Sequence, residues 1–145
     1  MSNPRMTIDY RDIGAPSKLL PFTAGSDVTY DRTLPGGSAQ VGLCVKISAS
    51  KTVALVGDGE GIAGTIDHVE PDGTVVVHLG PVIAVPGGTG ATLTPGSRIV
   101  GDLGPSNAKG YARSVAAATL AEVAVARGEI LDATDADAVQ VWMGD

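Results

Sequence analysis

The sequence predicts a mainly β fold, either a small β-barrel or a β-sandwich of short antiparallel strands. Among 145 residues there are 20 Gly and 9 Pro, so turns must be frequent. The apolar content is 43% but the aromatic content is only 3%, so the core must be built from aliphatic side chains. Short apolar runs alternate with turn residues, which favours several short strands over a few long helices. The length fits one ordinary domain.

The strands follow from the apolar runs and the turn residues that bound them. We expect strands at about 41–47, 52–56, 62–69, 74–79, 82–88, 98–101, 110–115, 129–133 and 138–143. The sequence EPDG predicts a type I turn with Gly73 in the left-handed region. Residues 114–127 fit either a strand, because valine is frequent there, or a short helix at about 115–126. We favour the helix, with Ser114 as its cap and Gly128 as its end.

The β-rich part of the chain, 34–145, shows signs of an internal duplication. Residues 34–42 match 93–101 at five of nine positions, and 64–80 match 128–144 at five of seventeen. The two matches occur in the same order along the chain. We therefore expect one β-rich domain made of two related units, 34–80 and 93–144.

Residues 1–33 differ from this domain and are predicted to form an extended N-terminal arm. Pro4, Pro16 and Pro21 interrupt a charged stretch that has no core of its own. Large apolar side chains are nevertheless concentrated here: Tyr10, Leu19, Leu20, Phe22 and Tyr30. Such a segment is expected to dock, either as an edge strand on its own domain or on a neighbouring subunit.

Charge and composition exclude several classes of partner. The net charge of -6, without any Lys/Arg cluster, argues against nucleic acid as a partner. No apolar run is long enough to span a membrane, and the polar N-terminus lacks a signal-peptide core, so we expect a soluble protein made in a cytoplasm. Cys44 is the single cysteine and is predicted to be a buried strand thiol.

One segment, GEGIAG at 59–64, satisfies the G-x-G-x-x-G pattern of dinucleotide-binding sites. Such a site needs a helix directly after the glycines, with its N-terminal amides facing the pyrophosphate. Here β-branched residues follow, and Pro71 and Gly73 leave no room for a useful helix. The glycines are therefore interpreted as turn and bulge residues, and no cofactor is predicted.

Two histidines are the strongest candidates for an enzymatic metal site. A three-residue loop at 71–73 would place His68 opposite Val76 and His78 opposite Ile66, on one face of a hairpin and with Glu70 beside His68. A zinc site requires three or four ligands. A third would have to come from Asp67, which points to the other face, or from a distant loop. We therefore interpret both histidines as surface or interface residues and expect no catalysis.

The segment DATDADA at 132–138 and the tryptophan that follows it carry the remaining candidates. The acids invite a calcium interpretation, but the run lacks the glycine and the closing glutamate of an EF-hand loop, so we predict an acidic hairpin turn. Trp142 alternates with Val139, Val141 and Met143, so either the tryptophan or the valines face outward. An outward Trp142 would be a candidate interface residue.

The order of these segments resembles one protein family. VGLCVKIS, VALVGDGEGIAGTI, PDGTVVVHLGPVIAVPGG, LTPGSRIVGD, KGYARSV and RGEILDATDADAVQVWMG are together similar to the capsid decoration, or cement, proteins of tailed double-stranded DNA bacteriophages. The resemblance covers about 34–144 and implies a small β-rich protein without catalytic residues. It further implies a homotrimer on the capsid surface of the virion that bridges subunits of the major capsid protein.

The residues fit this role independently of the resemblance. A cement protein needs a rigid sheet and an apolar arm, and three linked contacts raise the effective concentration at a shell. Under this hypothesis Tyr10, Leu19, Leu20, Phe22, Tyr30 and Trp142 supply contacts. Two alternatives remain: another phage structural β-protein, such as a tail-tube or head–tail component, and a metal-dependent enzyme using His68 and His78.

Overall fold

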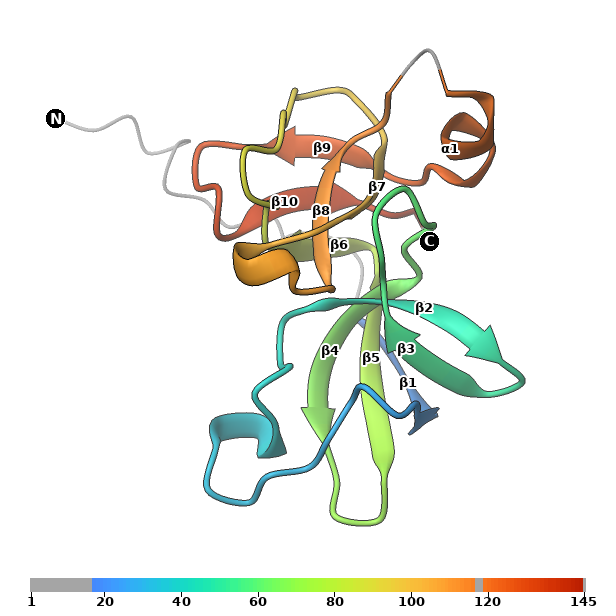
Figure 1. Cartoon of the computed structure of the whole chain (residues 1–145), viewed down its shortest axis with the longest axis vertical. Coiled ribbons are helices and arrows are strands. Elements are labelled where there is room, and N and C mark those ends of the chain that lie inside the picture. Colours follow the sequence, from blue (N-terminus) through green and yellow to red (C-terminus); the bar gives the residue numbers. More distant parts are fainter. Residues whose placement is uncertain (1–16, 117–118, 145) are drawn as a thin grey trace, which may run out of the picture.

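The fold is mainly β, and its larger element is a closed barrel (Figure 1). The computed structural model describes residues 17–116 and 119–144. The barrel has the strand order β1-β3-β2-β4-β5. Its strands are β1 (Lys18–Ala24), β2 (Cys44–Ala49), β3 (Thr52–Leu55), β4 (Gly64–Val69) and β5 (Thr74–Gly80). All neighbours pair antiparallel except β1 and β3, which are parallel over two residue pairs.

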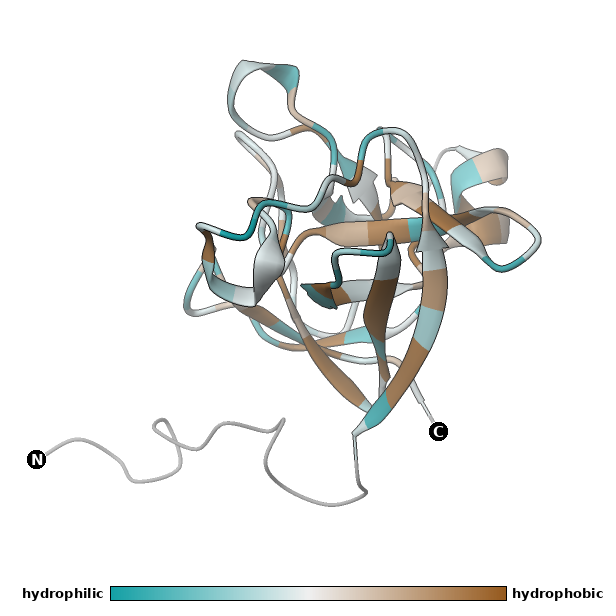
Figure 2. Cartoon of the chain, turned by 90° about the horizontal axis from the view of Figure 1, so that it is seen from below, coloured by the Kyte–Doolittle hydropathy of each residue, from teal (hydrophilic) through white to brown (hydrophobic). Residues whose placement is uncertain are grey.

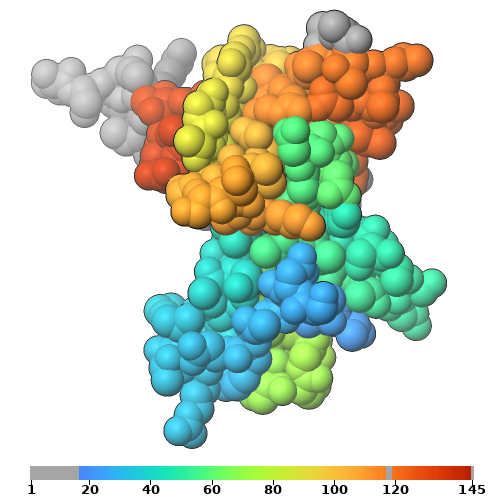
Figure 3. All heavy atoms as spheres, in the orientation of Figure 1, coloured from blue at the N-terminus to red at the C-terminus, as the bar shows by residue number. Residues whose placement is uncertain are grey.

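Two small sheets form the other half of the molecule, the upper half in Figure 1. One has the order β6-β10-β9, and the other pairs β7 with β8. The strands are β6 (Val82–Val85), β7 (Ile99–Asp102), β8 (Tyr111–Ser114), β9 (Glu129–Asp132) and β10 (Val139–Trp142). The short helix α1 (Leu120–Val125) precedes β9, and two 3-10 turns occupy Pro35–Gly37 and Pro105–Asn107. Figure 3 shows the two halves as separate lobes joined at a waist.

Each lobe has its own aliphatic core. In the barrel, buried valines of β2, β3 and β5 pack with Ile66 and Val28. The upper core gathers Ile83, Ile99, Ile130 and their neighbours, and it also takes in Cys44, Val56 and Ile62 from the barrel side of the chain. Figure 2 shows the hydrophobic residues in brown along the strands, with paler or teal residues between them. Burial of alternate residues is the pattern that the sequence predicts.

The predicted boundary of the arm at residue 33 differs from the structure. Residues 18–24 form β1, which pairs with β5 from Lys18 to Thr23 and so closes the barrel. Phe22 and Ala24 pack against the barrel core, which offsets the cost of ordering this strand. The alternative of an own-sheet strand is therefore the one found, and the loop at 25–43 also lies on the barrel, with Val28 buried.

The register of the β4–β5 hairpin was predicted correctly at one histidine and wrongly at the other. His68 lies opposite Val76 as expected, but His78 lies opposite Thr65 instead of Ile66. The cause is a register shift between Ile66 and His68, which leaves Asp67 as an extra residue. Gly73, at φ +88°, takes the predicted left-handed turn position.

The segment 114–127 is neither all strand nor all helix. Ser114 ends β8 instead of capping a helix, and α1 begins at Leu120 and ends at Val125, within the predicted range of about 115–126. Gly128, at φ +68°, lies beyond the end of the helix, with Ala126 and Arg127 between them.

The predicted duplication has support in one of its two matching segments. The β4–β5 and β9–β10 hairpins correspond, and Ile66, Val75 and Val77 are buried like Ile130, Val139 and Val141. The other match aligns the turn at Pro35–Gly37 with the run into strand β7. Val41 and Val100 occupy the same position in this match, but Val41 is exposed whereas Val100 is buried. The duplication therefore stays a prediction.

None of the helices in the described ranges is long and apolar enough to cross a membrane.

Candidate interaction surface

The predicted interface residues do not form a single surface. Leu19 and Leu20 of β1 are about half exposed, while Phe22 is partly buried against the barrel core. Trp142 is 41% exposed, because its neighbours Val141 and Met143 lie on the core side of the strand. It pairs with Val82, close to where β1 begins at Lys18 opposite Gly80. Tyr30 is 41% exposed but lies apart, against Gly37. Tyr10 lies outside the described residues.

Helix α1 presents apolar side chains to solvent and turns its one charged residue inward. Leu120 is 83% exposed, Val123 37% and Val125 41%, whereas Glu122 is buried at 9%. A surface helix normally has the opposite arrangement, with its apolar stripe on the core. We call Leu120, Val123 and Val125 the α1 patch. It was not among the residues predicted from the sequence.

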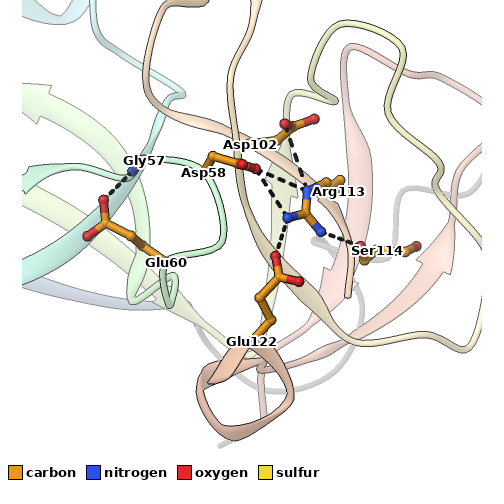
Figure 4. Close-up of polar contacts among 7 residues, drawn as sticks. All are labelled: Gly57, Asp58, Glu60, Asp102, Arg113, Ser114 and Glu122. Carbon is orange, nitrogen blue, oxygen red and sulfur yellow. Dashed lines mark hydrogen bonds and ion pairs between the residues drawn. The ribbon is translucent and has the colours of Figure 1, made fainter. Parts of the chain in front are cut away.

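The ion pairs of Arg113 explain why Glu122 points inward (Figure 4). The Arg113 guanidinium on β8 contacts the carboxylates of Glu122 and Asp58, at 3.1 Å for Asp58, and lies 3.9 Å from Asp102. Burial disfavours the charged guanidinium, yet hydrogen bonds to Glu122 and Asp58 outweigh burial and raise the pKa of Arg113. This cluster therefore fixes α1 with its apolar side outward.

The glycine-rich loop at 57–61 contributes Asp58 to the ion pairs of Arg113. The strand β4 follows it, where a dinucleotide site would have a helix. Its backbone bonds to β7, since the Gly59 N–H donates to the Gly101 carbonyl and the Gly101 N–H donates to the Glu60 carbonyl. Its Asp58 pairs with Arg113, and its Glu60 pairs with Lys46 of β2. The loop thus ties the barrel to the upper lobe, as Figures 1 and 4 show.

A groove of about 350 Å³ opens at one mouth of the barrel. Apolar side chains line it, and its cationic side chains are Lys18 and Arg127. The apolar lining comes from Phe22, Ile47, Ala63, Leu79 and Met143. Val45 and Ile47 lie two residues apart on β2 and therefore share its inner face. Val45 is buried, but Ile47 is 52% exposed. The groove is therefore a place where the barrel core reaches the surface, and we call it the barrel mouth.

The two histidines have different surroundings. His68 bonds through Nδ1 to Asp67 at 2.8 Å and lies 3.5 Å from Glu70 through Nε2. His78 lines a different depression with Asp67 and Asp137, and its buried Nε2 has no hydrogen-bond partner among the described residues. In the described ranges, no three His, Cys, Asp or Glu side chains are placed to hold a metal ion.

The ion pairs of His68 make a small part of the stability depend on pH. The hydrogen bond to Asp67 raises the pKa of His68, so its stabilising contribution is present below the unfolded pKa and disappears as pH rises through the folded pKa. We expect His68→Gln to lower the free energy of unfolding by about 0.5 kcal/mol at pH 5.5, because the pair is solvent-exposed. At pH 8.5 we expect no difference. Urea unfolding at both pH values measures this, and an equal loss at both would contradict it.

The acidic segment at 132–138 forms the predicted turn. Asp132 accepts a hydrogen bond from the Thr134 N–H at 2.9 Å, and Asp135 accepts one from the Asp137 N–H at 3.0 Å. The Thr134 side-chain and backbone bonds lower the pKa of Asp132. These carboxylates stabilise the turn that joins β9 to β10.

Cys44 is fully buried in β2, as predicted. Burial raises the pKa of its thiol far above the ordinary value, which favours the protonated form at neutral pH.

The sequence contains a signal for the α1 patch. Glu122 is the one charged residue between Ser114 and Ala126, and Arg113 stands directly before that run. A single acid in an apolar run with a nearby arginine indicates a buried ion pair, and then the apolar residues must face outward.

Comparison with protein-family models, with curated proteins and with solved structures finds no match to this chain.

Proposed function

We propose that this protein is a structural component of a phage virion that binds the outside of the capsid and bridges major capsid subunits as a trimer. The resemblance of its segments to capsid decoration proteins motivates the proposal. The mainly β fold, with a closed barrel and one short helix, supports it.

The observation that carries the proposal is the outward apolar side of α1. Exposed aliphatic side chains on a rigidly anchored helix are costly in solution and gain free energy when a partner covers them. The Arg113 cluster orders the helix in advance, so less conformational entropy is lost on binding. A protein with this surface is suited to adhesion.

The small size of the α1 patch favours a multivalent assembly. A stable interface buries about 800 Å² on each partner, which a six-residue helix alone does not supply. Three linked copies make the second and third contacts intramolecular and so raise the effective affinity. In the proposed trimer, each α1 contacts one capsid subunit.

We expect Leu120→Ser to weaken binding to expanded empty shells of the encoding phage by about tenfold or more per contact, since burial of one leucine contributes about 2 kcal/mol. Stability should change by less than about 0.5 kcal/mol, because the side chain is exposed. Co-sedimentation with shells and light scattering measure binding and mass.

Leu34→Ser is the matched control. Leu34 is also an exposed leucine, but it lies in the loop by the 3-10 turn on the barrel. Wild type and Leu34→Ser should be trimers that pellet with shells. A monomeric wild type that stays in the supernatant would contradict the proposal, and rings or tubes would point instead to a tail-tube component.

A further inference from the structure

A hollow of about 330 Å³ is lined by residues of both lobes, and we call it the interlobe hollow. Its polar side chains include Asp67 of β4, His78 of β5 and Asp137 of the turn between β9 and β10. Apolar side chains line the rest, among them Val41, Leu43 and Ala84. Small-molecule sites begin at about 300 Å³ and combine an apolar lining with a few polar groups. The interlobe hollow has both properties.

One nitrogen of His78 is buried without a partner. Val77, the residue before it, packs in the barrel core, so the imidazole lies on the outer side of β5, where the hollow is. Its Nε2 is buried and has no hydrogen-bond partner among the described residues. Such atoms are rare in folded proteins, and each calls for an explanation such as a ligand. In the neutral tautomer that carries its proton on Nδ1, Nε2 is an acceptor.

Two carboxylates line the same hollow, and the described chain adds no basic side chain to its lining. Asp67 is the extra residue of the register shift in β4, and a bulge of this kind re-aims a side chain. One oxygen of Asp67 is bonded to Nδ1 of His68 at 2.8 Å, but a carboxylate has further acceptor capacity. With Asp137 and the His78 nitrogen, the hollow therefore offers acceptors to a cationic ligand that carries N–H donors.

These polar groups are spread through the hollow instead of meeting at one point. In the described ranges, no three His, Cys, Asp or Glu side chains are placed to hold a metal ion. A ligand that reaches Asp67, His78 and Asp137 must therefore carry donors at more than one position, on a frame that suits an apolar lining. A short aliphatic diamine has this form, because each ammonium offers three N–H donors and methylenes join the two.

We propose that the interlobe hollow binds a short aliphatic diamine. One ammonium bonds to Asp137, the other bonds to Asp67, an N–H donates to Nε2 of His78, and the methylenes lie against the apolar lining. The net charge of -6 raises the local concentration of such cations. Because the two carboxylates belong to different lobes, the bound diamine also holds the lobes together. The proposal does not depend on shell binding.

The test titrates the full-length protein with butane-1,4-diamine. Calorimetry gives the dissociation constant, and nuclear magnetic resonance follows the ring resonances of His78, assigned with His78→Leu. Butylamine, with one ammonium, and butane-1,4-diol, with none, are the ligand controls. Asp137→Asn removes a carboxylate that lines the hollow, whereas the matched control Asp135→Asn removes one from the same turn outside the lining. Asparagine keeps the carbonyl oxygen through which residue 135 accepts the Asp137 N–H.

We expect one diamine to bind per chain and to shift the His78 resonances. Butylamine, and the diamine with Asp137→Asn, should bind about tenfold more weakly, as expected for loss of one hydrogen bond to a charged group. The diol should not bind. Asp135→Asn should change the dissociation constant by less than about twofold, because a carboxylate outside the hollow acts only through screened charge.

Three results would contradict the proposal. His78 resonances that stay unmoved at millimolar diamine would exclude the hollow as the site, and this is measured in the wild-type protein, so it holds even if a variant fails to fold. Equal weakening by Asp135→Asn and Asp137→Asn would show general attraction to an acidic surface. Butylamine that binds as tightly as the diamine would indicate a site for one ammonium, such as the lysine side chain of a partner protein.

Discussion

Arg113→Ala is expected to lower the free energy of unfolding by about 3 to 5 kcal/mol, the range for removal of one partner from a buried ion pair. The Glu122 side chain is 11% exposed and that of Asp102 15%, so both carboxylates would lose their cation in a poorly solvated place. Urea unfolding followed by circular dichroism measures the loss. Because the cluster also anchors α1, shell binding should fall together with stability.

The double variant Arg113→Met, Glu122→Leu separates the two roles of the pair. Replacement of both charges by apolar side chains of similar size should recover much of the stability lost in Arg113→Ala. If Arg113→Ala lost less than about 1 kcal/mol, the value typical of an exposed pair, the cluster would not be the anchor described above.

Gly101→Ala is expected to cost about 3 kcal/mol, the upper part of the usual range for forcing extra atoms into a packed site. A Cβ at Gly101 would clash with the Gly57 carbonyl oxygen of the glycine-rich loop and would lie 2.7 Å from Cγ2 of Val56. The first obstacle is backbone and cannot move aside without breaking the two hydrogen bonds between the loop and β7. Thermal and urea unfolding measure the loss.

Gly96→Ala serves as the control for Gly101→Ala. A Cβ at Gly96 meets open space, but the backbone there has φ +86°, so we expect only about 1 kcal/mol of backbone strain. If the two variants lost equal stability, steric contact with the loop would not be what requires glycine at 101.

Strand positions could be predicted because they depend on local alternation. The apolar positions of β5 and β10, with Val75, Val77, Val139 and Val141 pointing inward, follow from the period of two in the sequence. The acidic turn before β10 follows from the hydrogen bonds that Asp132 and Asp135 make to nearby backbone.

Features that depend on distant partners could not be predicted in this way. Nothing local reveals that residues 18–24 pair with 74–80, because the partner strand lies far along the chain. The extra residue at Asp67 is equally invisible, since a bulge leaves the apolar pattern readable in either register. The orientation of α1 depends on the pairing of Glu122 with Arg113, which requires the position of β8 to be known.

The pairing of β1 with β5 has a consequence for the order in which the chain acquires its structure. Of the barrel strands, β1 emerges from the ribosome first, yet its main partner β5 appears only after a further fifty or so residues have been made. Contacts between segments so far apart form slowly, because a long loop must close before they gain any free energy. The hairpins β2–β3 and β4–β5 are local and can form as soon as they emerge. The barrel therefore closes late, with the first of its strands to be synthesised.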